Sequence, residues 1–359
     1  MTAIQAALLL AALTALGCAL MISFVLERKL RRDKREFISQ TSRERLREAL
    51  LAGDQDVIRT AAACACDVAQ AQVDFAVTAS GTVDELTKAD LTTLHDTVTR
   101  IGLVDSLMKQ LRHRNPVNRG RAAFLIGELR IPKAGEVLPA LLADPDPDVR
   151  LVACAELGGI ATQAAALSLI SALMAGDLAP ERIIERLGGR WAVPSMVSVL
   201  EDPKLARSLA PDDCEVSGRW RPSVARALGV AADARAELTL ARMLDSPNTE
   251  ERVAGARALG PSGSEASVAV LIKALDDPAW EVRAQAAKSL GRHPEDRAVP
   301  ALEESLSDDA WWVRSNAADA LAEIGADGVE ALKRALSHSD RFARDRAQEA
   351  LALHQLAEA

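Results

Sequence analysis

The recurrence of one arginine constrains the fold of this chain more than any other feature of its sequence. Seven arginines occupy the same place in a repeated pattern, at spacings of 31, 71, 31, 31, 31 and 30 residues: Arg119, Arg150, Arg221, Arg252, Arg283, Arg314 and Arg344. The 71-residue step contains one further unit, in which residues 180–188 stand in the same frame without the arginine. About eight units are therefore predicted from residue 101 onward, and such an array folds as a solenoid in which each unit packs on its neighbours.

Each unit is predicted to form two short helices. An Asp or Pro-Asp turn precedes the first helix, where a carboxylate can cap free amides, and small residues such as Ala286 and Ala317 let neighbouring helices approach. The second helix carries apolar residues at helical spacing, as in Val268, Leu271 and Leu275. The first helix is expected to end at a glycine in the left-handed conformation, and these glycines are Gly127, Gly158, Gly229, Gly260 and Gly291.

The repeat resembles the HEAT-like repeat family, in the short 31-residue form known from phycobilisome bilin lyases. The matching features are an Asp-x-x-x-Val-Arg turn, as in residues 309–314, and an Ala-x-x-Leu-Gly helix end, as in residues 287–291. The resemblance covers about residues 101–355 and implies an all-α, right-handed α-solenoid of helix pairs with a generic binding surface. A bilin-lyase-like enzyme or enzyme subunit is the alternative it implies, although no repeat singles out a chromophore pocket.

The N-terminal region predicts a membrane anchor. Residues 6–26 form an uncharged stretch of 21 residues, and a helix of that length covers about 31 Å, the thickness of a bilayer core. Residues 1–26 are therefore predicted as a transmembrane anchor, and residues 36–100 as a helical cap or irregular repeat. A lipoprotein signal ending at Cys18 is an alternative that would put the body in the envelope, but eight apolar residues follow this cysteine where a polar tether is expected.

The orientation of the anchor follows from charge. Residues 27–35 form a basic collar with six basic and two acidic side chains, and no charged side chain precedes it. The positive-inside rule then places the bulk of the chain on the cytoplasmic side of a membrane, which we expect to be a bacterial inner membrane.

Charge and composition also argue against nucleic acid as a partner. The chain has 43 basic and 51 acidic residues, a net charge of −8, so the body beyond the basic collar is more acidic still. Phosphate backbones repel such a body, and only 3% of the residues are aromatic, which leaves few platforms for base stacking.

No pattern in the sequence predicts catalysis, a metal or a cofactor. The five histidines lie more than four residues apart, and the chain has no His-Glu dipeptide, the feature with which HEAT-like deoxyhypusine hydroxylases hold two irons. Cys64 and Cys66 would point about 200° apart on a helix, and Cys154 occupies a small-residue core position. We therefore expect no catalytic, metal-binding or cofactor-binding residue, and a protein that is not an enzyme.

The repeated arginines have two interpretations. They could form a stripe that binds a ligand, or each could pair with an acidic residue of a neighbouring turn, such as Asp148, Asp277 or Asp308. The second interpretation is favoured, and it predicts a structural ladder that keeps the repeats in register.

Two further features are candidate contacts for a partner. Trp280 and Trp311 lie three residues before their arginines, with Trp312 and Trp220 close by, so these rings either pack between adjacent loops or form an exposed edge that binds a protein. The insert at residues 203–219, which contains Asp212 and Asp213, is expected to be a loop and is either a binding element or a neutral insertion.

These observations together predict a membrane-anchored cytoplasmic scaffold. It would bind a protein partner through a concave surface formed by the second helices, through the insert or through the tryptophans. A membrane enzyme or an envelope or secretion assembly is the class of partner that we expect, although no residue selects among them.

Overall fold

A computed structural model describes residues 88–100, 102–176, 178–210, 220–261, 264–293 and 296–358, and in these ranges every regular element is a helix. The predicted anchor, basic collar and most of the predicted cap fall in residues 1–87, outside the described residues. No helix within the described ranges is long and apolar enough to cross a bilayer. The chain divides into two compact units, and in the described part the first holds residues 88–112 and 128–131.

The first unit contains two helices, α4 (Lys88–Arg100) and α5 (Leu103–Gln110). Gly102 joins them with a φ of 71°, a left-handed conformation that glycine adopts without steric cost. Leu94 and Leu107 are buried, so each helix contributes one apolar face to the core. This part of the chain is helical, as the sequence predicts.

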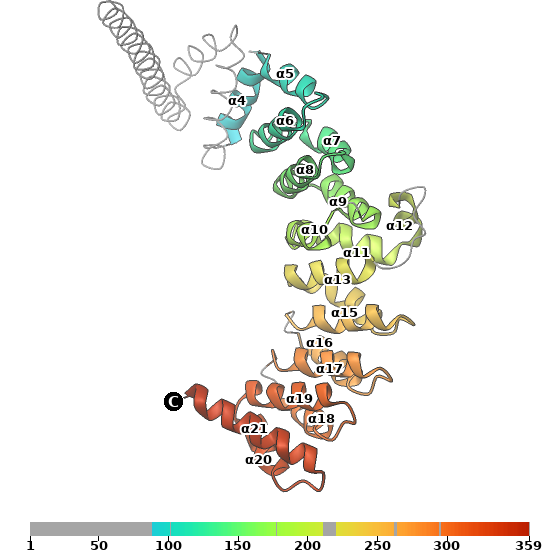
Figure 1. Cartoon of the computed structure of the whole chain (residues 1–359), viewed down its shortest axis with the longest axis vertical. Helices are drawn as coiled ribbons and strands as arrows, with labels where there is room; N and C mark the ends of the chain where they lie inside the picture. Colours follow the sequence, from blue (N-terminus) through green and yellow to red (C-terminus); the bar gives the residue numbers. More distant parts are fainter. Residues whose placement is uncertain are drawn as a thin grey trace, which may run out of the picture. The chain divides into compact units, whose positions relative to one another are not determined.

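The second unit is a stack of helix pairs (Figure 1). The first helices of the pairs, all of which except α10 carry a repeated arginine, are α6 (Pro116–Glu128), α8 (Pro147–Ile160), α10 (Pro180–Leu187), α13 (Trp220–Ala231), α15 (Thr249–Leu259), α17 (Trp280–Leu290), α19 (Trp311–Ile324) and α21 (Arg341–Glu358). The second helices are α7 (Ala134–Val137) continued by the 3₁₀ turn η2 (Leu138–Ala143), α9 (Gln163–Ala175), α11 (Val193–Glu201), η3 (Ala234–Ala236) with α14 (Glu237–Met243), α16 (Glu265–Ala274), η4 (Asp296–Ala298) with α18 (Val299–Ser305), and α20 (Ala326–Ala335). The fold is therefore an α-solenoid in which first helices pack on first helices and each pair covers the next.

Helix caps explain where several of these helices begin. Asp146 accepts hydrogen bonds from the amides of Asp148 and Val149 at the start of α8, and Asn248 accepts one from the Glu250 amide at the start of α15. The predicted capping by turn residues is thus present at these helices. In α17 and α19, an alanine occupies the cap position and contributes no side-chain hydrogen bond.

The prediction that the repeat glycines adopt a left-handed conformation is wrong, and they end only some of the first helices. Gly260 and Gly291 end α15 and α17 with right-handed φ values of −54° and −60°, whereas Gly229 lies inside α13. An added Cβ would lie 2.9 Å from Ala258 Cα at Gly229 and 2.8 Å from Ala320 Cα at Gly291. These glycines are therefore required because the next first helix passes directly over them.

Alanines take the left-handed position after two of the first helices. Ala161 follows α8 with a φ of 54°, and Ala232 follows α13 with a φ of 46°. Each stands three residues beyond the glycine that was expected to end its helix. The helix continues past the glycine, because the glycine serves packing between repeats rather than termination.

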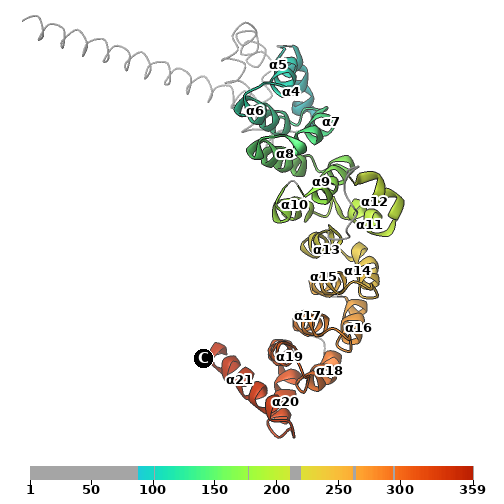
Figure 2. The same ribbon diagram turned by 45° about the vertical axis from the view of Figure 1, so that its right-hand side comes forward.

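The second unit curves toward the side formed by the first helices. Figure 2 shows α10, α13, α15, α17 and α19 on the inner side of the bend and α11, α14, α16 and α18 on the outer side. The expectation that the second helices form the concave surface is therefore wrong. The periodicity of apolar residues shows that each helix has a buried face, but it carries no information on the direction in which the stack bends.

The described half of the insert is helical where the sequence predicts a loop. Residues 203–209 form α12 (Pro203–Leu209), with Asp202 as its cap and Pro203 in the first turn. The helix packs on α9 and α11, and Ser171 Oγ donates a 2.7 Å hydrogen bond to the Leu209 carbonyl. Asp212 and Asp213 lie outside the described residues.

Candidate functional site

The repeated arginines connect successive helix pairs in the second unit. Arg252 donates from Nε and Nη2 to the carboxylate of Asp277 at 2.8 and 3.0 Å, and Arg283 donates in the same way to Asp308 at 2.7 and 2.9 Å. Nη1 of Arg283 also donates to the Asp277 carbonyl at 2.9 Å. Each of these turns therefore receives one arginine through its side chain and the next through its backbone, which is the ladder expected from the sequence.

The N-terminal end of the ladder uses a different aspartate from the one expected. Arg119 donates two hydrogen bonds to the carboxylate of Asp144, at 2.6 and 2.7 Å. Asp148, which was expected to pair with a repeated arginine, accepts no hydrogen bond from an arginine within the described residues. In all three bidentate pairs the aspartate stands 25 residues after the arginine. The spacing therefore identifies the partner, and it could have been found from the sequence.

The ladder is altered or interrupted where the position 25 residues after the arginine is not acidic. Ser246 stands there for Arg221, and both side chains instead meet the buried Glu251, at 3.1 Å from the arginine and 3.0 Å from the serine hydroxyl. The residue 25 positions after Arg150 is Ala175, and the residue 25 positions after Arg314 is Ser339.

These two arginines bind backbone carbonyls of their own turns through Nη1. Their buried Nε atoms have no hydrogen-bond partner within the described part of the chain. Arg344 has the same carbonyl contacts, to His338 and Ser339, and is half-buried. All seven repeated arginines thus occupy the same structural position, but only some of them have a carboxylate partner.

Pairing shifts the titration of the ladder carboxylates. Burial raises the pKa of Asp308, but hydrogen bonds from Arg283 and from the Ala310 amide outweigh it, so the net pKa is below its ordinary value. The hydrogen bond from Arg119 lowers the pKa of Asp144 despite burial. Both carboxylates are therefore held in the charged form that the arginines require.

Trp220 is not available to a partner in this structure. It is the first residue of α13 and is only 6% exposed, with the Arg221 guanidinium 5.5 Å from its ring centre. Its indole Nε1 has no hydrogen-bond acceptor among the described residues. Of the two interpretations, packing is the one that fits Trp220, so this ring is not a candidate contact for a partner. It stands directly before its arginine, in the place that the buried Val282 and Val313 occupy in later units.

The other three candidate tryptophans are exposed at the N-terminal ends of adjacent first helices. Trp280 is 41% exposed, Trp311 46% and Trp312 56%. The last two make an edge-to-face contact, with ring centres 4.6 Å apart and planes at 82°. Phe342, which the sequence interpretation missed, is 57% exposed and corresponds to Trp312 in the next unit. We call these four side chains the aromatic edge.

Arginines lie against the faces of the aromatic edge. The Arg314 guanidinium is 4.8 Å from the Phe342 ring centre, and that of Arg346 is 5.5 Å from Trp311. Cation–π contacts of this kind hold the rings in place while part of each ring stays exposed. Of the two interpretations of the tryptophans, the exposed edge fits these three side chains.

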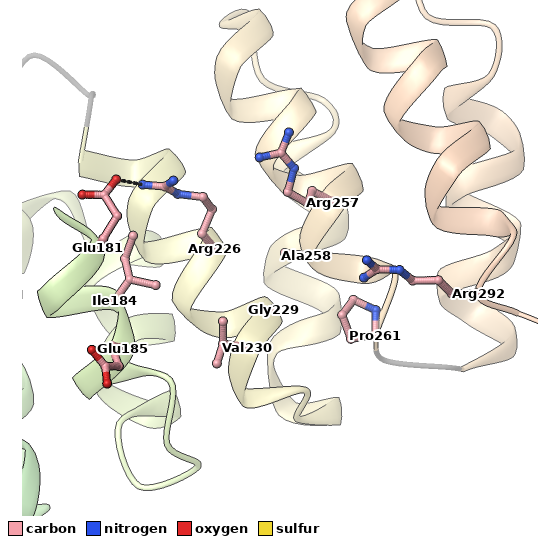
Figure 3. Close-up of a pocket in the computed structure, with 10 residues that line it drawn as sticks. All are labelled: Glu181, Ile184, Glu185, Arg226, Gly229, Val230, Arg257, Ala258, Pro261 and Arg292. Atoms are coloured by element: carbon pink, nitrogen blue, oxygen red, sulfur yellow. Dashed lines mark ion pairs between the residues drawn. The ribbon is translucent and has the colours of Figure 1, made fainter. Parts of the chain in front are cut away.

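A hollow of about 600 Å³ lies on the inner side of the bend, against α10, α13 and α15 (Figure 3). Its apolar surface comes mainly from Ile184, Val230, Ala258 and Pro261. Charged side chains surround these residues: Glu181, Glu185, Arg226, Arg257 and Arg292. The sequence interpretation did not find this hollow, because its residues come from four units and converge only through the stacking of the first helices.

The described histidines do not converge. Nε2 of His95 lies 2.9 Å from the Leu129 carbonyl oxygen, and the Nδ1 atoms of His113 and His338 accept backbone amide hydrogens in their own turns. Within the described residues no group of three His, Cys, Asp or Glu side chains is placed to hold a metal ion. Cys154 is buried in α8, and this burial raises the pKa of its thiol to about 11. Cys64 and Cys66 lie outside the described residues.

Stacked helix pairs and a ladder between their turns define the class of this protein as an α-solenoid. More specifically, HEAT repeats are found in it. The family described as HEAT repeats matches residues 104–187 and 268–352, and the PBS lyase HEAT-like repeat matches residues 251–277. No curated protein is significantly similar to the chain.

Solved structures resemble the chain at low identity. An engineered protein is 21% identical, with a TM-score of 0.35 over 88% of this chain and 99% of that one. Human deoxyhypusine hydroxylase in complex with glycerol is 18% identical, with a TM-score of 0.31 over 87% and 99% of the two chains. The karyopherin Kap121p bound to the SUMO protease Ulp1p is 15% identical, with a TM-score of 0.41 over 85% of this chain and 34% of that chain. At these identities and scores the similarity concerns the fold alone.

Proposed function

We propose that this chain is a non-enzymatic scaffold whose solenoid binds a protein partner and whose N-terminal segment attaches it to a membrane. The HEAT repeats support a binding role, because stacked helix pairs present an extended surface without a deep site. The observation that carries the proposal is the aromatic edge, in which large rings remain exposed on three adjacent first helices.

The aromatic edge is suited to protein binding on energetic grounds. Tryptophan buries roughly 200 Å² when fully covered, so covering the exposed half of each ring is worth about 2.5 kcal/mol at about 25 cal/mol per Å². Three such rings supply about 7.5 kcal/mol, which is less than the roughly 8 kcal/mol of a micromolar complex even before the cost of association, so the edge would act as the central hot spot of a larger interface. Tryptophan is also the residue type most enriched among binding hot spots.

Membrane attachment is proposed from residues 6–26 and from the basic collar at residues 27–35. The sequence supports an orientation with the solenoid on the cytoplasmic side of a bacterial inner membrane. A tethered binder raises the local concentration of its partner at the membrane, which is the mechanism that we propose. The partner class is a membrane enzyme or an envelope or secretion assembly.

The binding role is tested with the full-length chain purified in mild detergent together with its bound proteins. Trp311→Ala combined with Trp312→Ala should remove a partner that the wild-type chain retains, while the circular dichroism of the helices stays unchanged. The matched control is Leu238→Ala, because this leucine is 62% exposed in the second helix α14, away from the aromatic edge. Equal retention by the wild type and the double variant would contradict a role for the edge.

The membrane role is tested with a chain that begins at Ser42. This chain should leave the membrane fraction, and a partner that it still retains would place recognition in the solenoid. A partner that only the full-length chain retains would move recognition to the membrane segment. Fluorescent-protein and alkaline phosphatase fusions at the C-terminus test the orientation, and phosphatase activity without fluorescence would contradict the cytoplasmic placement.

A further inference from the structure

We infer that the hollow against α10, α13 and α15 binds a polypeptide segment of the partner in which an apolar side chain is flanked by carboxylates. This inference rests on the proposed scaffold role, but it uses residues separate from the aromatic edge. Its basis is the combination of an apolar floor, unpaired arginines and acidic flanks in one place on the concave side.

The size and lining of the hollow suit an inserted side chain. Its volume of about 600 Å³ falls in the range of roughly 300–1,000 Å³ typical of ligand sites. Val230 is 63% exposed at its surface, whereas Ile184 and Ala258 beneath it are buried. An apolar side chain that covers this valine removes exposed hydrocarbon from water without displacing a hydrogen-bonded group.

The arginines at the hollow have N–H groups that are available to a ligand. Arg226 has Glu181 at 3.9 Å, and both side chains remain well exposed. The Nε of Arg257 donates to Gln285 at 3.1 Å, which leaves its two terminal nitrogens available. Within the described part of the chain, no carboxylate lies within ion-pair distance of Arg257 or Arg292. A ligand carboxylate would supply the missing partner in a bidentate pair.

The positive charge is confined to this part of the array. Five residues after the repeated arginines, successive units carry Arg226, Arg257 and Lys288, followed by Asp319 and Glu349. The α10 unit, directly before them, carries Glu185 in the equivalent place, and the two units before that carry Ala155 and Phe124. The basic run therefore spans three units only, and acidic side chains follow it.

This charge pattern favours a peptide over a polyanion. A nucleic acid or an anionic bilayer would extend past three units and meet Asp319 and Glu349, as well as the net negative charge of the chain. A short acidic segment with an apolar anchor matches both the hollow and the limited run of cations. Glu181 and Glu185 at the α10 side disfavour carboxylates there, so the acidic residues should lie toward α15 and α17.

The first test is selection from a library of random 12-residue peptides displayed on phage, with the full-length chain in mild detergent as the bait. We expect a consensus of Asp or Glu around a Leu, Ile, Val or Phe residue. The combined variant Arg257→Ala and Arg292→Ala should lose this consensus. Arg207→Ala is the control, because this arginine is exposed on α12 outside the hollow. No consensus, a basic consensus, or an acidic consensus unaffected by the double variant would overturn the inference.

The second test measures the dissociation constant of the selected peptide by fluorescence anisotropy. The double variant should weaken binding at least tenfold, because charge-assisted hydrogen bonds are lost, and Arg207→Ala should change it less than twofold. Binding should also weaken on raising the salt concentration from about 0.05 to 0.5 M. Displacement of the peptide by duplex DNA, or by vesicles containing phosphatidylserine, at equal charge concentration would assign the site to a polyanion instead.

Different results would refute the proposal for the aromatic edge and the inference for the hollow. Trp311→Ala with Trp312→Ala should leave peptide binding unchanged, because these rings do not line the hollow. Absence of peptide binding beside a partner retained through the tryptophans would refute the hollow alone. Peptide binding without any tryptophan-dependent partner would refute the role of the aromatic edge alone.

Discussion

Arg283→Ala tests whether the repeated arginines hold the helix pairs together. The substitution removes two charge-assisted hydrogen bonds to Asp308 and two to the carbonyls of Asp277 and Pro278. The two paired side chains are only 18% and 12% exposed, so little water replaces the lost contacts. Removing one partner of a fully buried pair costs about 3–5 kcal/mol. Because Asp308 keeps the Ala310 amide and some solvent, we expect a loss of about 2–3 kcal/mol.

Hydrogen exchange with mass spectrometry measures this loss locally. A solenoid is stabilised by contacts between neighbours, so the damage should concentrate in α17 and α19 and spread toward α21. A loss of 2–3 kcal/mol corresponds to exchange that is roughly 30- to 150-fold faster. Urea unfolding followed by circular dichroism gives the global counterpart.

Arg344→Ala provides the matched control. This arginine donates only to the carbonyls of His338 and Ser339, so its removal should cost about 1 kcal/mol or less. Arg283→Lys should fall between the two, because lysine keeps the charge but cannot form the bidentate pair. Unchanged protection of α17 and α19 in Arg283→Ala would refute the ladder. So would intact stability with loss of partner binding, which would make the arginine a binding residue.

Three further predictions concern acid stability, packing and thiol reactivity. The pKa of Asp308 is lower in the folded chain than in the unfolded chain. Its contribution to stability is therefore full above the unfolded value of about 3.9 and is lost as the pH falls through the folded pKa. Asp308→Asn should accordingly reduce the acid-induced loss of unfolding free energy, which urea unfolding below pH 4 measures. Gly229→Ala should lower the free energy of unfolding by about 1–3 kcal/mol through overpacking. Gly159→Ala should stabilise α8 by up to about 1 kcal/mol, because the space around an added Cβ is open. Equal melting temperatures for the two variants would contradict the packing argument. At pH 8 the peptide that contains Cys154 should remain unmodified by iodoacetamide until urea unfolds the chain, because burial raises the pKa of this thiol to about 11.

Much of the fold could be predicted because each repeat is defined by residues that lie close together in the sequence. The frame of the arginines places each first helix, and the residue 25 positions later explains which arginine has a carboxylate partner, as Asp308 and Ser339 illustrate. The same frame separates two of the tryptophans. Trp220 stands directly before its arginine, in the place of the buried Val282, whereas Trp311 stands three residues before its arginine and is exposed.

The role of the glycines is a feature that the repeat frame leaves open. A glycine after an Ala-x-x-Leu run is compatible with helix termination and with close helix contact, since both need the absence of a Cβ. The contact of Gly229 with Ala258 in the following first helix decides between them. The two residues are distant in the pattern and meet only when the units stack.

The sequence by itself determined the all-helical repeat, the helix pairs and the regular placement of the arginines, because helix formation depends on neighbours three and four residues apart and on caps. Only the tertiary structure decided which side of the second unit is concave, what the repeat glycines contact, and where Val230, Arg257 and Arg292 converge. The physical reason is that curvature accumulates from small rotations between successive units. Those rotations depend on the volumes of side chains that meet across units, which no single period of the sequence records.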